Sequence, residues 1–136
     1  MGDLIYVRLD ADRVGEKLEL FLLEGNISEA GELHRSVQSA MEKLRHRVEE
    51  EGLKVLFSGC DDALFSCPSS RYRREFLEEL RGCFLERTRC SLSCGVGFTV
   101  TEALQNLRIA KLAGRDRIVG PLDYKLPANP SGAADG

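Results

Sequence analysis

Apolar positions between Leu4 and Val119 follow two different periods. Alternating or short continuous apolar runs rich in β-formers predict strands at 4–9, 53–57, 63–67, 91–98 and 117–119. Apolar residues that recur every three or four positions predict helices at about 13–24, 30–48, 72–84 and 103–110. The order β-α-α-β-β-α-β-α-β contains a hairpin flanked by β–α connections. It predicts an α+β, ferredoxin-like domain: a central antiparallel sheet with helices on one face plus an extra edge strand.

Polar and glycine residues mark where the predicted helices begin and end. Asn26 is answered three residues later by Glu29, and Thr99 by Glu102, so each pair fits a capping box. Glycines follow the first, second and last helical segments, at positions 25, 52 and 114. Glycine is the usual residue just past a helix end because it adopts left-handed backbone angles at little cost.

The composition predicts one folded domain over residues 1–122 and a flexible tail over 123–136, where Pro, Gly, Ala and Ser dominate. The chain has no run of 18 apolar residues, so no membrane span is expected. Its cysteine count is five, an odd number, and no two form a C-x-x-C pair. This usage favours reduced thiols in a cytoplasmic protein.

Net charge narrows the class of partner. Lys and Arg number 19 against 22 Asp and Glu, which gives a formal charge of −3. Because binding to duplex nucleic acid depends on a basic face that releases counterions, no direct duplex binding is expected.

Four carboxylates fall at the ends of strands that are expected to be neighbours. Asp10 and Asp12 end the first strand, and Asp61 and Asp62 form the tip of the hairpin. So many like charges at one edge of a sheet would be costly unless cations neutralised them. Two Mg²⁺ or Mn²⁺ ions with a substrate triphosphate would do so, and such a pair promotes in-line displacement at phosphorus. The alternative is that one pair caps a helix and the other shapes a turn.

A basic cluster lies elsewhere in the sequence. Arg108, Lys111 and Arg115 are spaced to share one face of the last helix and its exit loop. They can hold the terminal phosphates of a nucleotide, or they can simply form a solvated face that is favoured at a helix C-terminus. Gly95 and Gly97 permit a ligand or a second backbone to approach the preceding strand closely.

Three segments carry a resemblance to palm-domain nucleotidyl cyclases. Residues 58–65, SGCDDALF, look like the G-G-D-D loop of CRISPR polymerases and, more distantly, the G-G-D-E-F loop of diguanylate cyclases. Residues 94–98, CGVGF, are similar to the S-I-G-V-A strand, and residues 110–118, AKLAGRDRI, to the A-K-x-x-G-R-N-R-V segment. The resemblance covers residues 4–119, and the chain is expected to be a palm domain without the added domains of the large CRISPR polymerases. It points to the minimal CRISPR polymerase (mCpol) family.

The resemblance implies roles for individual residues. Asp10 and Asp61 would bridge two Mg²⁺ or Mn²⁺ ions, the carbonyl of Ala11 would add a ligand, and Asp62 would be a further ligand or a proton acceptor. Catalysis is assigned to Asp61 and Asp62. The substrate-binding candidates are Asp12, Gly59, Cys60, Arg108, Lys111 and Arg115, of which Lys111 and Arg115 would grip the terminal phosphates.

The family resemblance also implies a function. The protein would condense ATP into a cyclic di- or oligoadenylate for anti-phage defence, acting as a homodimer because each palm holds one nucleotide. A downstream effector would read the product.

Two positions depart from the pattern of the relatives. Cys60 replaces the second glycine of the hairpin, so that turn must tolerate a side chain. Leu18 stands where diguanylate cyclases carry an asparagine that reads guanine, which favours ATP over GTP. Three alternatives remain: a diguanylate cyclase-like enzyme that uses GTP, a catalytically weak palm that senses a nucleotide, and an interaction module.

Overall fold

The computed structural model describes residues 3–121, and the predicted tail at 123–136 lies outside this range. The strands are β1 (Leu4–Ala11), β2 (Lys54–Ser58), β3 (Asp62–Pro68), β4 (Leu92–Gly97) and β5 (Ile118–Val119). The helices are α1 (Val14–Leu23), α2 (Ile27–Glu50), α3 (Arg74–Thr88) and α4 (Val100–Leu112), with a 3-10 turn at Ser69–Arg71. The predicted order of elements is therefore confirmed, with boundaries that move by a few residues.

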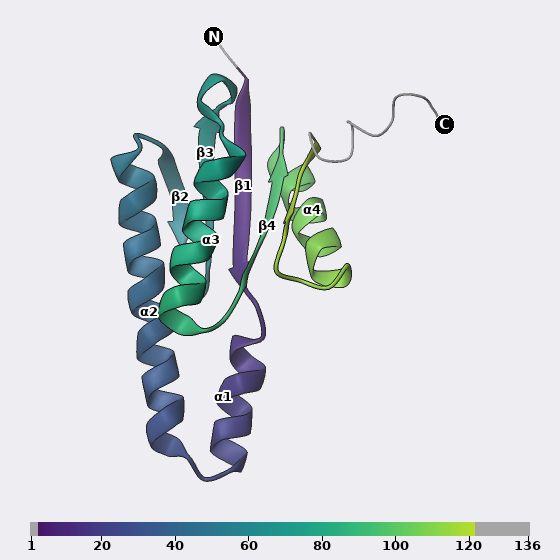
Figure 1. Cartoon of the computed structure of the whole chain (residues 1–136). Coiled ribbons are helices and arrows are strands. Elements are labelled where there is room, and N and C mark those ends of the chain that lie inside the picture. Colours follow the sequence, from purple (N-terminus) through teal and green to yellow (C-terminus); the bar gives the residue numbers. More distant parts are fainter. Residues whose placement is uncertain (1–2, 122–136) are drawn as a thin grey trace.

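The strands form one sheet in the order β2-β3-β1-β4-β5, with β1 at its centre (Figure 1). β1 pairs antiparallel with both β3 and β4, as expected. β5 pairs parallel with β4, because α4 carries the chain back along the sheet before β5 begins. The sheet is mixed, and the α+β palm class is confirmed.

One face of the sheet is packed against α2 and α3. Paired residues of β1 and β4, such as Val7 with Val96 and Leu9 with Cys94, point to this face. The helices contribute the stripe that the sequence predicts, and the largest wholly buried side chains include Phe65, Phe84, Leu9, Leu77, Leu92, Val7 and Val48. Burial of these side chains is the main source of the stability of the domain.

The last helix differs from the expectation that the helices share one face. α4 lies against the opposite face of β4, where Ser93, Gly95 and Gly97 point. A Cβ atom on Gly95 would clash with the α4 backbone at Ala103 and Leu107. The two glycines of β4 therefore admit a second backbone, which is one of the two alternatives that the sequence left open.

Both predicted N-caps are present. The Asn26 side chain accepts a hydrogen bond from Glu29 N at 3.2 Å, and Thr99 Oγ1 accepts one from Glu102 N at 3.0 Å. α1 and the start of α2 extend beyond the end of the sheet (Figure 1). None of the helices within residues 3–121 is long and apolar enough to cross a membrane. The five cysteines are free thiols.

Candidate active site

The end of β1 meets the tip of the β2–β3 hairpin at one edge of the sheet. Asp10 lies opposite Asp62 in the β1–β3 register, and Ala11 N donates a hydrogen bond to Asp61 O at 2.8 Å. One carboxylate oxygen from each of Asp10, Asp61 and Asp62 lies within 4.8 Å of the others. These three side chains form what we call the acidic cluster. The expectation that these two regions of the chain meet is confirmed.

Asp61 shows the electrostatic cost of this arrangement. Burial raises the pKa of its carboxyl above the ordinary value, and the neighbouring charges of Asp10 and Asp62 raise it further. Such a site favours a cation. Carboxylate and carbonyl oxygens are the ligands that Mg²⁺ and Mn²⁺ prefer, so the residues present fit these ions.

Two cationic side chains of the protein already contact the acidic residues. Arg8 Nη2 lies 2.8 Å from Asp62 Oδ2, while Arg8 Nη1 donates to Leu9 O at 2.9 Å. The guanidinium carbon of Arg8 also lies 5.4 Å from the centre of the Phe57 ring. The sequence reading missed Arg8. The available signal was the alternation in β1, which places Arg8 on the same face as Asp10.

Lys111 reaches the acidic cluster from α4. Its Nζ lies 3.1 Å from Asp10 Oδ2, 3.1 Å from Ala11 O and 2.6 Å from Asp12 Oδ1. The sequence analysis assigned Lys111 to the terminal phosphates. In the structure its ammonium contacts two of the predicted metal ligands, Asp10 and Ala11.

Asp12 is set apart from the cluster, and only 3% of the residue is exposed. Ser91 Oγ donates to its Oδ2 at 2.6 Å, and Ser93 Oγ donates to its Oδ1 at 2.8 Å. Burial raises the pKa of Asp12, but the hydrogen bonds from Lys111, Ser91 and Ser93 outweigh it and bring the pKa below the ordinary value. The predicted substrate contact of Asp12 stays a prediction, and its partners here are protein groups. Ser91 and Ser93 were missed, although their alternation with Gly95 placed them on one face.

The two arginines of the predicted basic cluster are placed differently. Arg115 is partly buried, has a φ of 66°, and donates from its backbone N to Ala110 O at 2.8 Å. Arg108 is exposed on α4 and, within residues 3–121, has no ion pair. The structure thus brings Lys111, but not Arg108, into contact with the acidic residues.

The remaining site candidates, Gly59 and Cys60, lie at the tip of the β2–β3 hairpin. Gly59 N donates to Asp62 O at 2.8 Å, and a Cβ atom at Gly59 would clash with Asp62 Oδ1. Cys60 is exposed, and its φ is not in the left-handed region. A cysteine therefore fits the second glycine position without backbone strain.

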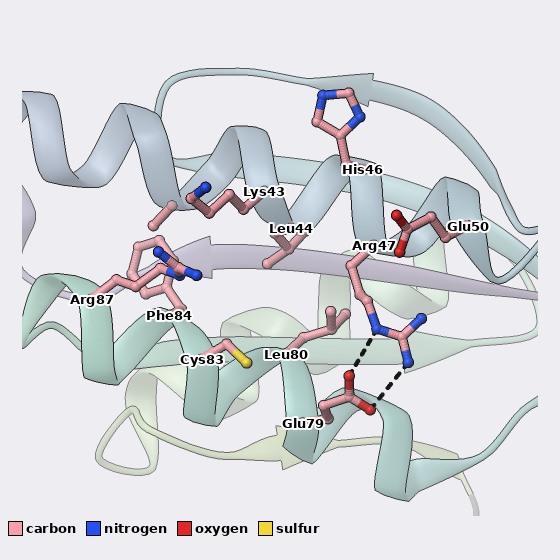
Figure 2. Close-up of a pocket in the computed structure, with 11 residues that line it drawn as sticks. Lys43, Leu44, His46, Arg47, Glu50, Glu79, Leu80, Cys83, Phe84 and Arg87 are labelled. Atoms are coloured by element: carbon pink, nitrogen blue, oxygen red, sulfur yellow. Dashed lines mark hydrogen bonds and ion pairs between the residues drawn. The ribbon is translucent and has the colours of Figure 1, made fainter.

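A separate groove of about 370 Å³ lies between α2 and α3 (Figure 2). Arg47 and Glu79 form an ion pair across it, with Arg47 Nε 2.8 Å from Glu79 Oε2. None of the lining residues belongs to the acidic cluster. The candidate active site is therefore the acidic cluster at the end of β1, and not this groove.

A sheet of order β2-β3-β1-β4-β5, with carboxylates where β1 meets the β2–β3 hairpin, defines a palm domain like those of polymerases and nucleotidyl cyclases. The family model described as the minimal CRISPR polymerase domain, mCpol, matches residues 6–121. The chain belongs to this family.

Solved structures share the fold at low sequence identity. The Csm1-Csm4 cassette in complex with cA4 matches with a TM-score of 0.64 and 19% identity, over 85% of this chain and 20% of that chain. The same cassette in complex with AMPPNP gives a TM-score of 0.67 at 19% identity, again over 85% and 20%. The active GGEEF domain of a diguanylate cyclase from Vibrio cholerae gives 0.61 at 17% identity, over 88% and 83%. This chain thus spans about a fifth of the Csm1-Csm4 chain. No curated protein matches the sequence.

Proposed function

We propose that this protein is a nucleotidyl cyclase that condenses ATP into a cyclic di- or oligoadenylate. The observation that carries the proposal is the acidic cluster of Asp10, Asp61 and Asp62, with the Lys111 ammonium beside it. Membership in the minimal CRISPR polymerase family supports a nucleotidyl transfer reaction. The complexes of the Csm1-Csm4 cassette with AMPPNP and with cA4 support adenine nucleotides as the class of substrate and product.

In the proposed reaction, a ribose hydroxyl oxygen of one ATP attacks the α-phosphorus of another. A new phosphorus–oxygen bond forms, the bond to the β-phosphate breaks, and pyrophosphate leaves. A second attack of the same kind closes the ring. Two Mg²⁺ or Mn²⁺ ions, when bound, would supply Lewis-acid activation of the attacking and leaving oxygens.

Protein groups divide the remaining tasks. Asp10, Asp61 and the carbonyl of Ala11 would hold the ions, and Asp62 would be a further ligand or accept the hydroxyl proton. Lys111 and Arg115 would bind the terminal phosphates through charge-assisted hydrogen bonds. Because one palm presents one nucleotide, a homodimer would bring the two nucleotides together. The proposal includes a cytoplasmic location with reduced thiols, and an effector in anti-phage defence that reads the cyclic product.

The residue type at position 18 supports the choice of ATP. Leu18 is partly buried and packs against the hydrophobic core. An aliphatic side chain offers no hydrogen-bond donor or acceptor to the edge of guanine. ATP is therefore expected to be used in preference to GTP.

The test is to incubate the full chain with ATP and Mg²⁺ or Mn²⁺, and to assay pyrophosphate and cyclic products by chromatography and mass spectrometry. Asp61→Ala is expected to abolish both. The matched control is Glu79→Ala, which removes a carboxylate from the α2–α3 groove, away from the acidic cluster. A parallel incubation with GTP distinguishes an ATP-using enzyme from one that makes a cyclic guanylate. Wild-type protein that yields no pyrophosphate and no cyclic product from ATP would contradict the proposal.

A further inference from the structure

Asp12 joins parts of the chain that are far apart in sequence. It follows β1 directly, and its carboxylate binds Ser91 and Ser93 near the start of β4, Lys111 on α4, and the backbone N of Asp116. Both carboxylate oxygens are engaged: Oδ1 by Lys111 and Ser93, and Oδ2 by Ser91, Ser93 and Asp116 N. A buried carboxylate with this many donors is held firmly in one position.

The contact with Lys111 fixes a long and otherwise mobile side chain. Lys111 Nζ is 2.6 Å from Asp12 Oδ1 and 3.1 Å from Asp10 Oδ2. The side chain of Asp10 is 32% exposed and that of Asp12 is 3% exposed. Since charge–charge attraction is screened less when a partner is buried, Asp12 is the stronger anchor of the ammonium.

A second contact holds the turn that carries Arg115. Gly114, Arg115 and Asp116 have φ values of 126°, 66° and 54°, so three successive residues have positive φ. Residues other than glycine adopt this region only where the surroundings enforce it. Asp116 N donates to Asp12 Oδ2 at 3.1 Å and to Ser93 Oγ at 3.0 Å. Asp12 and Ser93 therefore stabilise the turn.

We infer that Asp12 is a positioning residue, which sets Lys111 and the Arg115 turn in place to receive the terminal phosphates and does not itself touch substrate. This inference rests on the proposed function. Lys111, on α4, is 101 residues further along the chain than Asp10, and Arg115 lies in the turn that follows α4. Asp12, two residues after Asp10, ties both to the acidic cluster.

The experiment measures the affinity of the full chain for AMPPNP with Mg²⁺ by calorimetry, together with the melting temperature. Asp12→Asn is expected to weaken AMPPNP binding about tenfold, which corresponds to about 1.4 kcal/mol. In a Lys111→Met background the same change is expected to cost threefold or less, because its main target is already absent. Glu79→Gln removes one carboxylate charge from the distant α2–α3 groove and is expected to leave affinity within twofold.

A merely structural role would lower the melting temperature and leave the affinity of the folded fraction unchanged. A direct contact between Asp12 and the nucleotide would instead make the losses of affinity from Asp12→Asn and Lys111→Met multiply. Either result overturns the inference. If Asp12→Asn does not fold, Ser93→Ala decides, because it removes one donor to Asp12 and one acceptor for Asp116 N. A loss of two- to fivefold supports the inference, and unchanged affinity overturns it.

The two proposals fail in different ways. If wild type binds AMPPNP but forms no cyclic product, the cyclase proposal fails and the binding data still decide the role of Asp12. If wild type forms product and Asp12→Asn binds AMPPNP as wild type does, only the inference fails. If wild type does not bind AMPPNP, both fail.

Discussion

The close approach of α4 to β4 gives a prediction with a matched pair of variants. Gly95→Ala would place a methyl group against the α4 backbone at Ala103 and Leu107. Backbone atoms cannot rotate away as a side chain does, so α4 must shift. Overpacking of this kind costs about 1–3 kcal/mol. For a domain of this size, a change of 1 kcal/mol moves the melting temperature by roughly 4 °C, so a decrease of about 4–12 °C is expected.

Gly82→Ala is the control, because it makes the same chemical change with the opposite expected sign. Gly82 lies in the exposed interior of α3, and a Cβ atom there would meet nothing within 4 Å. Alanine in a helix interior is favoured over glycine by about 1 kcal/mol, so the melting temperature is expected to rise by roughly 4 °C.

The Gly95 variant is also expected to bind AMPPNP more weakly, because α4 carries Lys111. Thermal melting and calorimetry on both variants check these expectations. Equal melting temperatures for Gly95→Ala and wild type would refute the reasoning that glycine is required there for contact between two backbones.

Four further predictions concern the acidic cluster and its surroundings. Gly59→Ala is expected to lower the proposed cyclase activity at least tenfold, because the added methyl group would push Asp62 aside. Cys60→Gly is expected to lower the free energy of unfolding by about 0.4–1 kcal/mol in thermal melts, because no left-handed φ requires glycine at this position. Because the pKa of Asp61 is raised in the folded protein, the metal-free protein loses stability as pH rises through that pKa. Asp61→Asn should therefore raise the melting temperature at pH 7. The same variant should also lose the increase in melting temperature that Mn²⁺ gives the wild-type protein. The lowered pKa of Asp12 acts in the opposite sense: its carboxylate stabilises the fold above the unfolded pKa, near 3.8, and this stability is lost as pH falls through the lower folded pKa. Melting temperatures measured across this pH range should show the loss in the wild-type protein and not in Asp12→Asn. Arg8→Met is expected to cost about 1–2 kcal/mol at pH 7 by leaving Asp62 without its partner, and Mn²⁺ should restore more stability to this variant than to wild type; equal responses to Mn²⁺ would argue against this.

Much of the fold and the centre of the site could be predicted from the sequence, because local patterns encode them. Helical stripes, caps and alternation are properties of neighbouring residues, and they placed the elements in the correct order. The meeting of Asp10 with Asp62 followed from strand ends and hairpin topology alone. The side-chain partners did not follow, because Arg8 and Asp62 are 54 residues apart and Ser93 and Asp12 are 81 apart. Such pairs depend on register and helix placement, which periodicity does not encode.

The tripeptide Asp10-Ala11-Asp12 shows why residue type and spacing were insufficient to assign roles. All three were predicted to serve metal or substrate, yet the strand ends at Ala11 and the two carboxylates enter different surroundings. Asp10 lies in the acidic cluster with its side chain 32% exposed, whereas Asp12 is buried against β4 and α4.

Lys111 contacts all three of these residues, and this shared contact has a consequence for the proposed metal ions. A divalent ion bound by Asp10 and the carbonyl of Ala11 would compete with the ammonium for those oxygens. It would not compete for Asp12, whose other hydrogen bonds are to Ser91, Ser93 and the backbone of Asp116. Lys111 would therefore leave the metal ligands and stay tethered to Asp12, with its remaining donors free for phosphate. In this arrangement the ammonium that pairs with Asp10 without metal would, with the ions bound, become a ligand for the nucleotide that they accompany.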